Sequence, residues 1–304
     1  TPVKVSITAN IDDKTAMEER LVITTGMEDG VLSPKGDQVA FAVRGELWLV
    51  PVKKGKGPNA DDATQLTDYA GVDAQPIWHP DGKHLFFVSD RNGAERIFRM
   101  NVETKEVTPW VRDDYDQSQL QLTPDKRHLT YWLAGPQGGL FKVALTGGAP
   151  ERLLDRPWLT PYAISPDGRY LAYTQLTPNT GFKPWDNGSN LWVKDLVSGK
   201  HQAVTELNVQ HSSPTWSVDG RYLYVRSSRD GGGIFALPTT PEIARTTELE
   251  LKFEKPKEAV KVEFDWEDTE QRLRRWVAAS MQGGAPISDP NTGALYYMNG
   301  GGVW

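Results

Sequence analysis

The sequence contains no cysteine among its 304 residues, which excludes disulfide bonds and thiolate metal sites. This absence does not by itself identify the cellular compartment. Long apolar runs are missing too, because no segment approaches the ~18 consecutive apolar residues of a transmembrane helix. Helical periodicity is nearly absent. The one stretch with a helical pattern, Glu267–Trp276, could equally be an irregular edge strand.

Charge and catalytic motifs are equally sparse. The net charge is −6 and no basic stripe occurs, which disfavours binding to nucleic acid or to an anionic membrane. No GxSxG elbow, HExxH motif or phosphate-binding loop is present. We therefore predict no catalytic residues, no metal site and no cofactor, with two alternatives left open. These are a calcium ion among the carboxylates and a catalytic triad assembled across the fold from the five dispersed histidines, His79, His84, His128, His201 and His211.

One short phrase recurs along the chain. Its cleanest copy reads AISPDGRYLAYTQ, and the six copies begin at Val31, Ile77, Leu120, Ala163, Thr215 and Pro286. Successive turn prolines are 46, 44 and 42 residues apart, namely Pro34, Pro80, Pro124 and Pro166. A period in the low to mid forties, made of strand-like segments, is typical of four-stranded propeller blades.

Each copy carries its own turn chemistry. Proline presets φ, an acidic residue follows and glycine ends the turn, as in Pro166-Asp167-Gly168. We therefore interpret the equivalent aspartates as structural, and His79, which replaces the serine of the phrase, as a cap of its turn. An apolar-aromatic couple then marks the third strand, and we expect its aromatic residues to wedge between blades as core. The couples are Leu47-Trp48, Ile97-Phe98, Leu140-Phe141, Leu191-Trp192, Ile234-Phe235 and Val303-Trp304.

We predict one all-β domain over residues 1–304, a six-bladed β-propeller of four-stranded antiparallel blades. The predicted limits are 1–25 for a closing strand, then 26–72, 73–114, 115–156, 157–208 and 209–282 for blades one to five, and 283–304 for the start of blade six. The closing strand, with strand-like segments Val3–Thr8 and Arg20–Thr25, would complete blade six and protect two open sheet edges. The alternatives are an open ring, and seven blades if Pro238–Gln282 contains further strands.

Three segments resemble known families. The repeated phrase is similar to the PD40 repeat of TolB-like propellers. VKVEFDWEDTEQRLRR, from Val260, resembles the blade-closing segments of tricorn-type serine peptidases, and LSPKGDQVAFAVRGELWLVPV, from Leu32, followed by ATQLTD, resembles the opening blade of such chains. The resemblance implies a non-catalytic propeller whose parent protein has its nucleophile in a later domain. It provides no short motif that assigns roles to individual residues.

Propeller geometry places the loops that enter the inner strands on one face, which we predict to be the binding rim. Its residues are Asp73, Gln75, Gln117, Tyr162, His211 and Ser213. A long loop in blade four would stand over this rim with Phe182, Lys183, Trp185 and Asp186, unless its two aromatic residues fold back to fill the loop itself. Acidic residues on the rim would attract a cationic or amine-bearing peptide end, and they are Glu28, Asp29, Asp73 and Asp116.

Three functions remain open at this point. The first is a non-catalytic propeller that receives or gates peptides for a tricorn-like peptidase, so that its partners are a peptide or protein and the other domains of a longer chain. Because the chain starts at Thr1 without methionine, we expect it to be a processed or excised piece. The second is a free-standing TolB-like adaptor in an extracytoplasmic space, a location that the resemblance slightly favours. The third is an enzyme with its active site in the central channel.

Overall fold

A computed structural model describes residues 26–53, 62–155, 160–176, 188–206, 209–245, 260–279, 285–299 and 302–303. Strands dominate this part of the chain. The helical segments described are a single 3-10 turn at Arg229–Gly231 and the short helices α1 (Pro241–Arg245) and α2 (Thr269–Arg272). Among the described residues, no helix has the length and apolar character needed to cross a membrane.

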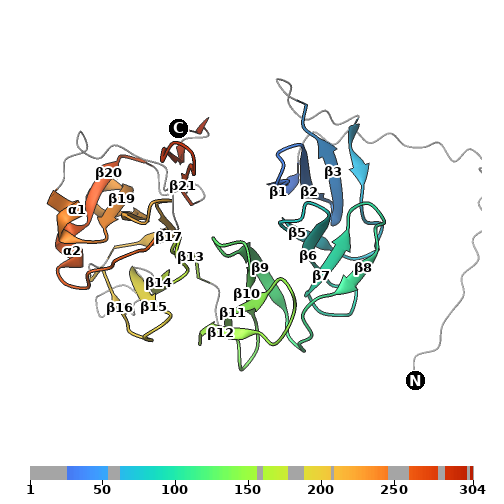
Figure 1. Ribbon diagram of the computed structural model, residues 1–304, viewed down its shortest axis with the longest axis horizontal. Helices are drawn as coiled ribbons and strands as arrows, with labels where there is room; N and C mark the ends of the chain where they lie inside the picture. Colours follow the sequence, from blue (N-terminus) through green and yellow to red (C-terminus); the bar gives the residue numbers. More distant parts are fainter. Residues whose placement is uncertain are drawn as a thin grey trace, which may run out of the picture.

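Five antiparallel sheets of four strands follow one another around an arc (Figure 1). Within each sheet the strands lie side by side in chain order. They are β1 (Met27–Leu32), β2 (Gln38–Val43), β3 (Glu46–Pro51) and β4 (Thr64–Gln65); β5 (Asp73–Trp78), β6 (His84–Ser89), β7 (Arg96–Asn101) and β8 (Val107–Pro109); β9 (Gln117–Leu122), β10 (His128–Leu133), β11 (Gly139–Ala144) and β12 (Glu151–Leu154); β13 (Tyr162–Ile164), β14 (Tyr170–Leu176), β15 (Ser189–Asp195) and β16 (His201–Ala203); β17 (His211–Trp216), β18 (Tyr222–Ser227), β19 (Gly233–Pro238) and β20 (Arg274–Val277).

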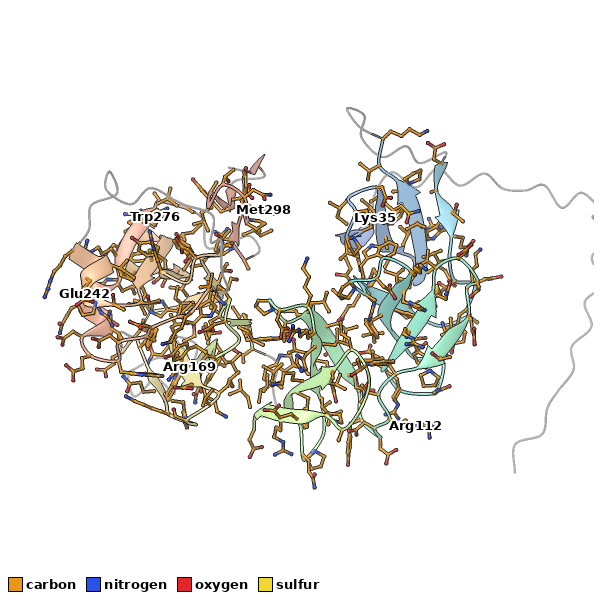
Figure 2. The ribbon with its side chains drawn as sticks, in the orientation of Figure 1. Lys35, Arg112, Arg169, Glu242, Trp276 and Met298 are labelled. Carbon is orange, nitrogen blue, oxygen red and sulfur yellow. The ribbon has the colours of Figure 1, made fainter. Side chains whose placement is uncertain are left out.

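The architecture is an all-β, six-bladed propeller, as predicted. After the five complete blades, two short two-stranded sheets stand at the place of the sixth, β21 (Ile287–Ser288) with β22 (Leu295–Tyr296) and β23 (Met298–Asn299) with β24 (Gly302–Val303). Lys35 of blade one and Met298 of β23 lie on opposite sides of the opening in the arc (Figure 2). The predicted closing strand falls in residues 1–25, outside the described residues.

The turn between the first two strands of a blade is held by its own side chains. Ser165 Oγ donates to Asp167 Oδ1 at 2.6 Å and accepts the backbone N–H of Tyr170 at 2.8 Å. Thr123 and Ser217 donate to their turn aspartates in the same way, at 2.6 and 2.7 Å. The turn aspartates of blades three, four and five are therefore structural, as the sequence indicated.

The third-strand couples form the core differently from our expectation. The aliphatic member of each couple in the five complete blades is fully buried, and these residues are Leu47, Ile97, Leu140, Leu191 and Ile234. Trp48, Phe141 and Trp192 are only partly buried. Each aromatic member pairs across the sheet with a second-strand residue, as Tyr173 does with Trp192. Phe98 and Phe235 are buried in the core as predicted, with 2 and 1% of their surface exposed, whereas the three partly buried aromatic residues cover the sheet.

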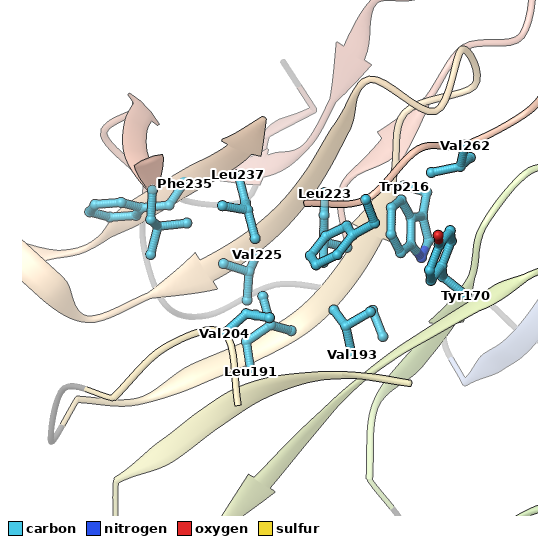
Figure 3. Packing of buried hydrophobic residues seen from close by; sticks show 13 residues of the cluster. Tyr170, Leu191, Val193, Val204, Trp216, Leu223, Val225, Phe235, Leu237 and Val262 are labelled. Carbon is cyan, nitrogen blue, oxygen red and sulfur yellow. The ribbon is translucent and has the colours of Figure 1, made fainter. Parts of the chain in front are cut away.

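Neighbouring blades are joined by apolar packing and by tryptophan hydrogen bonds. Trp78 Nε1 donates to the carbonyl of Val31 in blade one, and Trp216 Nε1 donates to that of Ala163 in blade four, both at 3.2 Å. Figure 3 shows the cluster between blades four and five, where Trp216 lies against Tyr170 and Val225 lies near Leu191. Burying each such side chain contributes roughly 1.5–3 kcal/mol.

The long insertion of blade five reinforces this cluster. Val262 and Phe264 are buried in it, and the backbone N–H of Val262 donates to Asp167 Oδ2 at 2.8 Å. The stretch Glu267–Trp276, for which helix and edge strand were both open, contains one of each: α2, and then most of β20, the fourth strand of blade five. The described part of the insertion therefore supplies the fourth strand of blade five and packs against that blade.

Candidate functional site

The inner strands of all five complete blades line a central cavity of about 480 Å³. Its lining also includes Ala285, which precedes β21. A second cavity of about 730 Å³ shares Gln121, Tyr162, Pro214 and Ala285 with the first and extends toward the turn prolines. Together the two cavities form the channel of the propeller.

A left-handed residue interrupts four of the inner strands where they line the channel. These residues have φ between 52° and 54°, and they are Asp29, Gln75, Gln119 and Ser213. The strand register shifts at each of these places, which is the mark of a β-bulge. A residue other than glycine in this conformation costs on the order of 1–3 kcal/mol, so such strain tends to persist where the surrounding structure uses it. The bulge brings these four residues into the cavity lining.

The bulge residues link one blade to the next. Asp29 Oδ2 accepts the backbone N–H of Gln75 at 3.1 Å, and Gln75 Oε1 accepts the backbone N–H of Gln119 at 2.7 Å. In blade four the equivalent position is Pro161, which has no N–H to donate. The side chains of blades one and two are thus held in place at the channel wall.

Tyr162 provides a fixed hydroxyl in the same wall. Its hydroxyl lies 2.8 Å from Thr130 Oγ1 and donates a long hydrogen bond, 3.5 Å, to the carbonyl of Gln119. Burial raises the pKa of Tyr162 well above its usual value, and the hydrogen bond with Thr130 offsets this only in part. The phenol therefore stays protonated and acts as a hydrogen-bonding group, not as a base.

The described lining of the smaller cavity carries few charges. With Tyr162 neutral, Asp29 is the one charged side chain among the described residues around the 480 Å³ cavity, and prolines, aliphatic residues and amides make up most of the remainder. Apart from Asp29 and Tyr162, the described lining contains no titratable side chain. A carboxylate beside amide and hydroxyl groups can hold an amine or a peptide backbone.

The structure divides the predicted rim residues into two groups. Gln75, Tyr162 and Ser213 line the channel together. Asp73, Gln117 and His211 line neither cavity and are buried, with 0, 0 and 2% of their surface exposed, so they do not form the exposed rim that we expected.

The buried members of the predicted rim hold neighbouring segments together. Arg91 pairs with the Asp73 carboxylate, and Gln117 Oε1 accepts the N–H of Ile97 from blade two at 2.9 Å. The backbone N–H of His211 donates to Ser189 Oγ at 2.8 Å. Each lies at the start of an inner strand, where the preceding blade packs against it, and this explains their burial.

The remaining predicted residues are placed as follows. Glu28, Asp29 and Asp116 are exposed, and Asp116 Oδ1 accepts the backbone N–H of Glu95 at 3.0 Å. The blade-four loop residues Phe182, Lys183, Trp185 and Asp186 lie outside the described residues.

Gln119 was not among the predicted lining residues, although its position in the repeat identifies it. Each bulge residue stands four positions before the first residue of its turn, as Gln119 does before Thr123. Aligning the repeat copies on the turn would have found it.

Residues 32–252 match the family of tricorn protease N-terminal β-propeller domains, which is well over half of the chain. The chain belongs to this family. Lasso peptide isopeptidase AtxE2 of Asticcacaulis excentricus is 27% identical over 230 residues, covering 73% of this chain and 28% of that protein. Dipeptidyl-peptidase 5 of Porphyromonas gingivalis is 21% identical over 270 residues, covering 70% of this chain and 39% of that protein.

Among solved structures, the tricorn protease matches 93% of this chain with a TM-score of 0.62 and 15% identity. At that identity the likeness shows the fold alone. The match covers 29% of the tricorn protease chain, so this sequence corresponds to less than a third of that protein, as it does for the isopeptidase.

Proposed function

We propose that this propeller is a non-catalytic domain that binds the amino-terminal end of a peptide in its channel and passes it to a peptidase domain of the same protein. The observation that carries the proposal is the channel lining, in which one exposed carboxylate, Asp29, stands beside fixed amide and hydroxyl groups. A peptide amine is the complement of this set, because it carries one positive charge and donates several hydrogen bonds.

The relatives support the peptidase context. Two of them are named as peptidases, and in each the chain matches only a minor part of the protein. A domain that accompanies a peptidase, and whose described lining has no acid–base pair, is suited to receiving substrates rather than cleaving them. The inner strands of the five complete blades line the channel, so we expect only an extended chain or a narrow terminus to enter it.

The proposal is tested by binding of fluorescently labelled octapeptides, with free or acetylated amino termini, to the purified chain. We expect the free amine to bind about fivefold more tightly, since an exposed ion pair contributes on the order of 1 kcal/mol. Asp29→Asn keeps an oxygen for the N–H of Gln75 and should abolish the difference. Asp116→Asn, which removes an exposed carboxylate outside the described cavity lining, serves as the matched control.

Three outcomes would contradict the proposal. The first is an absence of binding by either peptide, and the second is a preference for the free amine that Asp29→Asn leaves unchanged. Cleavage of the peptides by the isolated chain, followed by mass spectrometry, would overturn the non-catalytic role.

A further inference from the structure

A second cluster of polar side chains lies outside the channel, at the turn between β5 and β6 of blade two. His79, Asp81 and His84 each place a potential metal-ligand atom within 4.8 Å of the other two. None of the three lines either channel cavity. The cluster is thus independent of the proposed peptide site.

Both imidazoles lie close to the same carboxylate oxygen. His84 Nδ1 lies 2.7 Å from Asp81 Oδ2, and His79 Nδ1 lies 3.1 Å from it. The two rings are close to perpendicular, with an interplanar angle of 80°, so they approach the oxygen from different directions. The two Nδ1 atoms therefore converge on one carboxylate oxygen.

The cluster is accessible from solvent. The side chains of the three residues are between 23 and 34% exposed. An ion can therefore reach the cluster from solvent, and at least one coordination position would remain open.

The other blades show what is unusual here. In blades three, four and five, the residue equivalent to His79 is Thr123, Ser165 or Ser217, and its hydroxyl donates a proton to the turn aspartate. In blade two, His79 Nδ1 instead accepts the backbone N–H of Asp81 at 3.2 Å. This agrees with the turn-capping role expected from the sequence.

His79 Nδ1 thus lies close to both the backbone N–H of Asp81 and the Asp81 carboxylate, 3.1 Å from Oδ2. Blade three has a single imidazole at its turn, with His128 Nδ1 3.7 Å from Asp125 Oδ2, and a threonine satisfies the carboxylate there. Only blade two, among the described turns, combines two imidazoles with the aspartate.

We propose that His79, Asp81 and His84 bind a divalent transition-metal ion, with zinc the best match. Two imidazole nitrogens and one carboxylate oxygen are a ligand set that zinc, nickel and copper prefer over calcium or magnesium. Coordination would replace the long contact between His79 and the Asp81 backbone and would fasten the first two strands of blade two at their turn. The open position would accept water or a ligand atom from a partner.

The test uses the full chain, freed of any polyhistidine tag and of metal. Titration with zinc chloride, followed by isothermal calorimetry, should show one equivalent bound with a micromolar or lower dissociation constant, while calcium at the same concentration should not bind. His79→Ser gives blade two the same Ser-Pro-Asp-Gly turn sequence as blade four, so the variant should fold normally. We expect it to weaken zinc binding by at least about 10-fold, since even residues that only support metal ligands contribute that much.

The matched control is His128→Ser, which removes the single imidazole of blade three and should leave zinc affinity unchanged. Thermal unfolding provides a second measurement, because an ion that binds only the folded chain raises its melting temperature. Zinc should raise the melting temperature of the wild type and of the control but not that of His79→Ser. No binding at 100 µM zinc, on the order of 100-fold above the expected dissociation constant, or equal binding by His79→Ser, would overturn the proposal.

Discussion

Arg91 neutralises a buried charge: its Nη2 lies 2.9 and 2.8 Å from the two carboxylate oxygens of Asp73, and Asp73 has no exposed surface. The same guanidinium lies over the rings of Phe87 and Phe98, at 5.3 and 5.0 Å from their centres. Stacking on aromatic rings and pairing with a carboxylate suit the planar guanidinium better than they suit an ammonium group. A residue expected on the binding rim thus serves the interior of blade two.

Removing Arg91, the positive partner of Asp73, should lower the stability of the fold strongly. We expect Arg91→Met to lower the free energy of unfolding by about 3–5 kcal/mol, because it leaves the Asp73 carboxylate buried and unpaired. The exposed pair of Lys53 and Asp62, 2.7 Å apart, provides the control. Lys53→Met should lower stability by less than about 1 kcal/mol. Urea denaturation of both variants measures the two losses of unfolding free energy. Equal losses would show that leaving the Asp73 carboxylate unpaired costs no more than breaking an exposed ion pair.

His211 should make the protein less stable in mild acid. Its two ring nitrogens have no hydrogen-bond partner in the described part of the chain, and burial, with the charge of Arg229, lowers the pKa of His211 from 6.5 to about 4. Between these values the unfolded chain binds a proton and the folded chain does not. Stability is therefore complete above pH 6.5, falls as the pH drops toward 4, and loses roughly 3 kcal/mol in total.

Urea denaturation at pH 7 and at pH 4 should show this loss in the wild type, and His211→Phe should remove most of it. Asp81, whose pKa is lowered from 3.8 to about 2, loses most of its contribution to stability below pH 4 and adds little to the change within this window. A variant that keeps the full loss of stability would show that another group is responsible.

Two turn glycines with the same backbone conformation should respond differently to alanine. Gly168 and Gly220 have φ of 75° and 71°, which alanine adopts at a cost of about 1–2 kcal/mol. A Cβ on Gly168 would meet no atom within 4 Å, whereas one on Gly220 would lie 2.6 Å from Val262 Cγ2. We expect Gly220→Ala to cost about 1–3 kcal/mol more than Gly168→Ala, because it displaces the packed insertion of blade five. Equal losses in chemical denaturation would show that Val262 moves aside freely.

The repeat and its turns could be predicted from the sequence because they depend on residues close together in the chain. Ser165, Asp167 and Gly168 satisfy each other within a few positions, so the same letters produce the same turn in each copy. The spacing of these turns then predicted the propeller and its blades. The choice of Gln75 and Ser213 as lining residues also followed, since the geometry of the repeat places the inner strands around the channel.

What only the tertiary structure decided lies where blades meet. The bulge that brings Gln119 into the channel wall is bonded to Gln75 of the preceding blade. Likewise, the burial of Asp73 depends on Arg91, a residue of the loop after the second strand, and nothing near Asp73 in the sequence announces that pair. Short-range chemistry determined the repeating unit, whereas exposure, charge pairing and the direction of each side chain depend on surfaces that distant segments form only after the chain has folded.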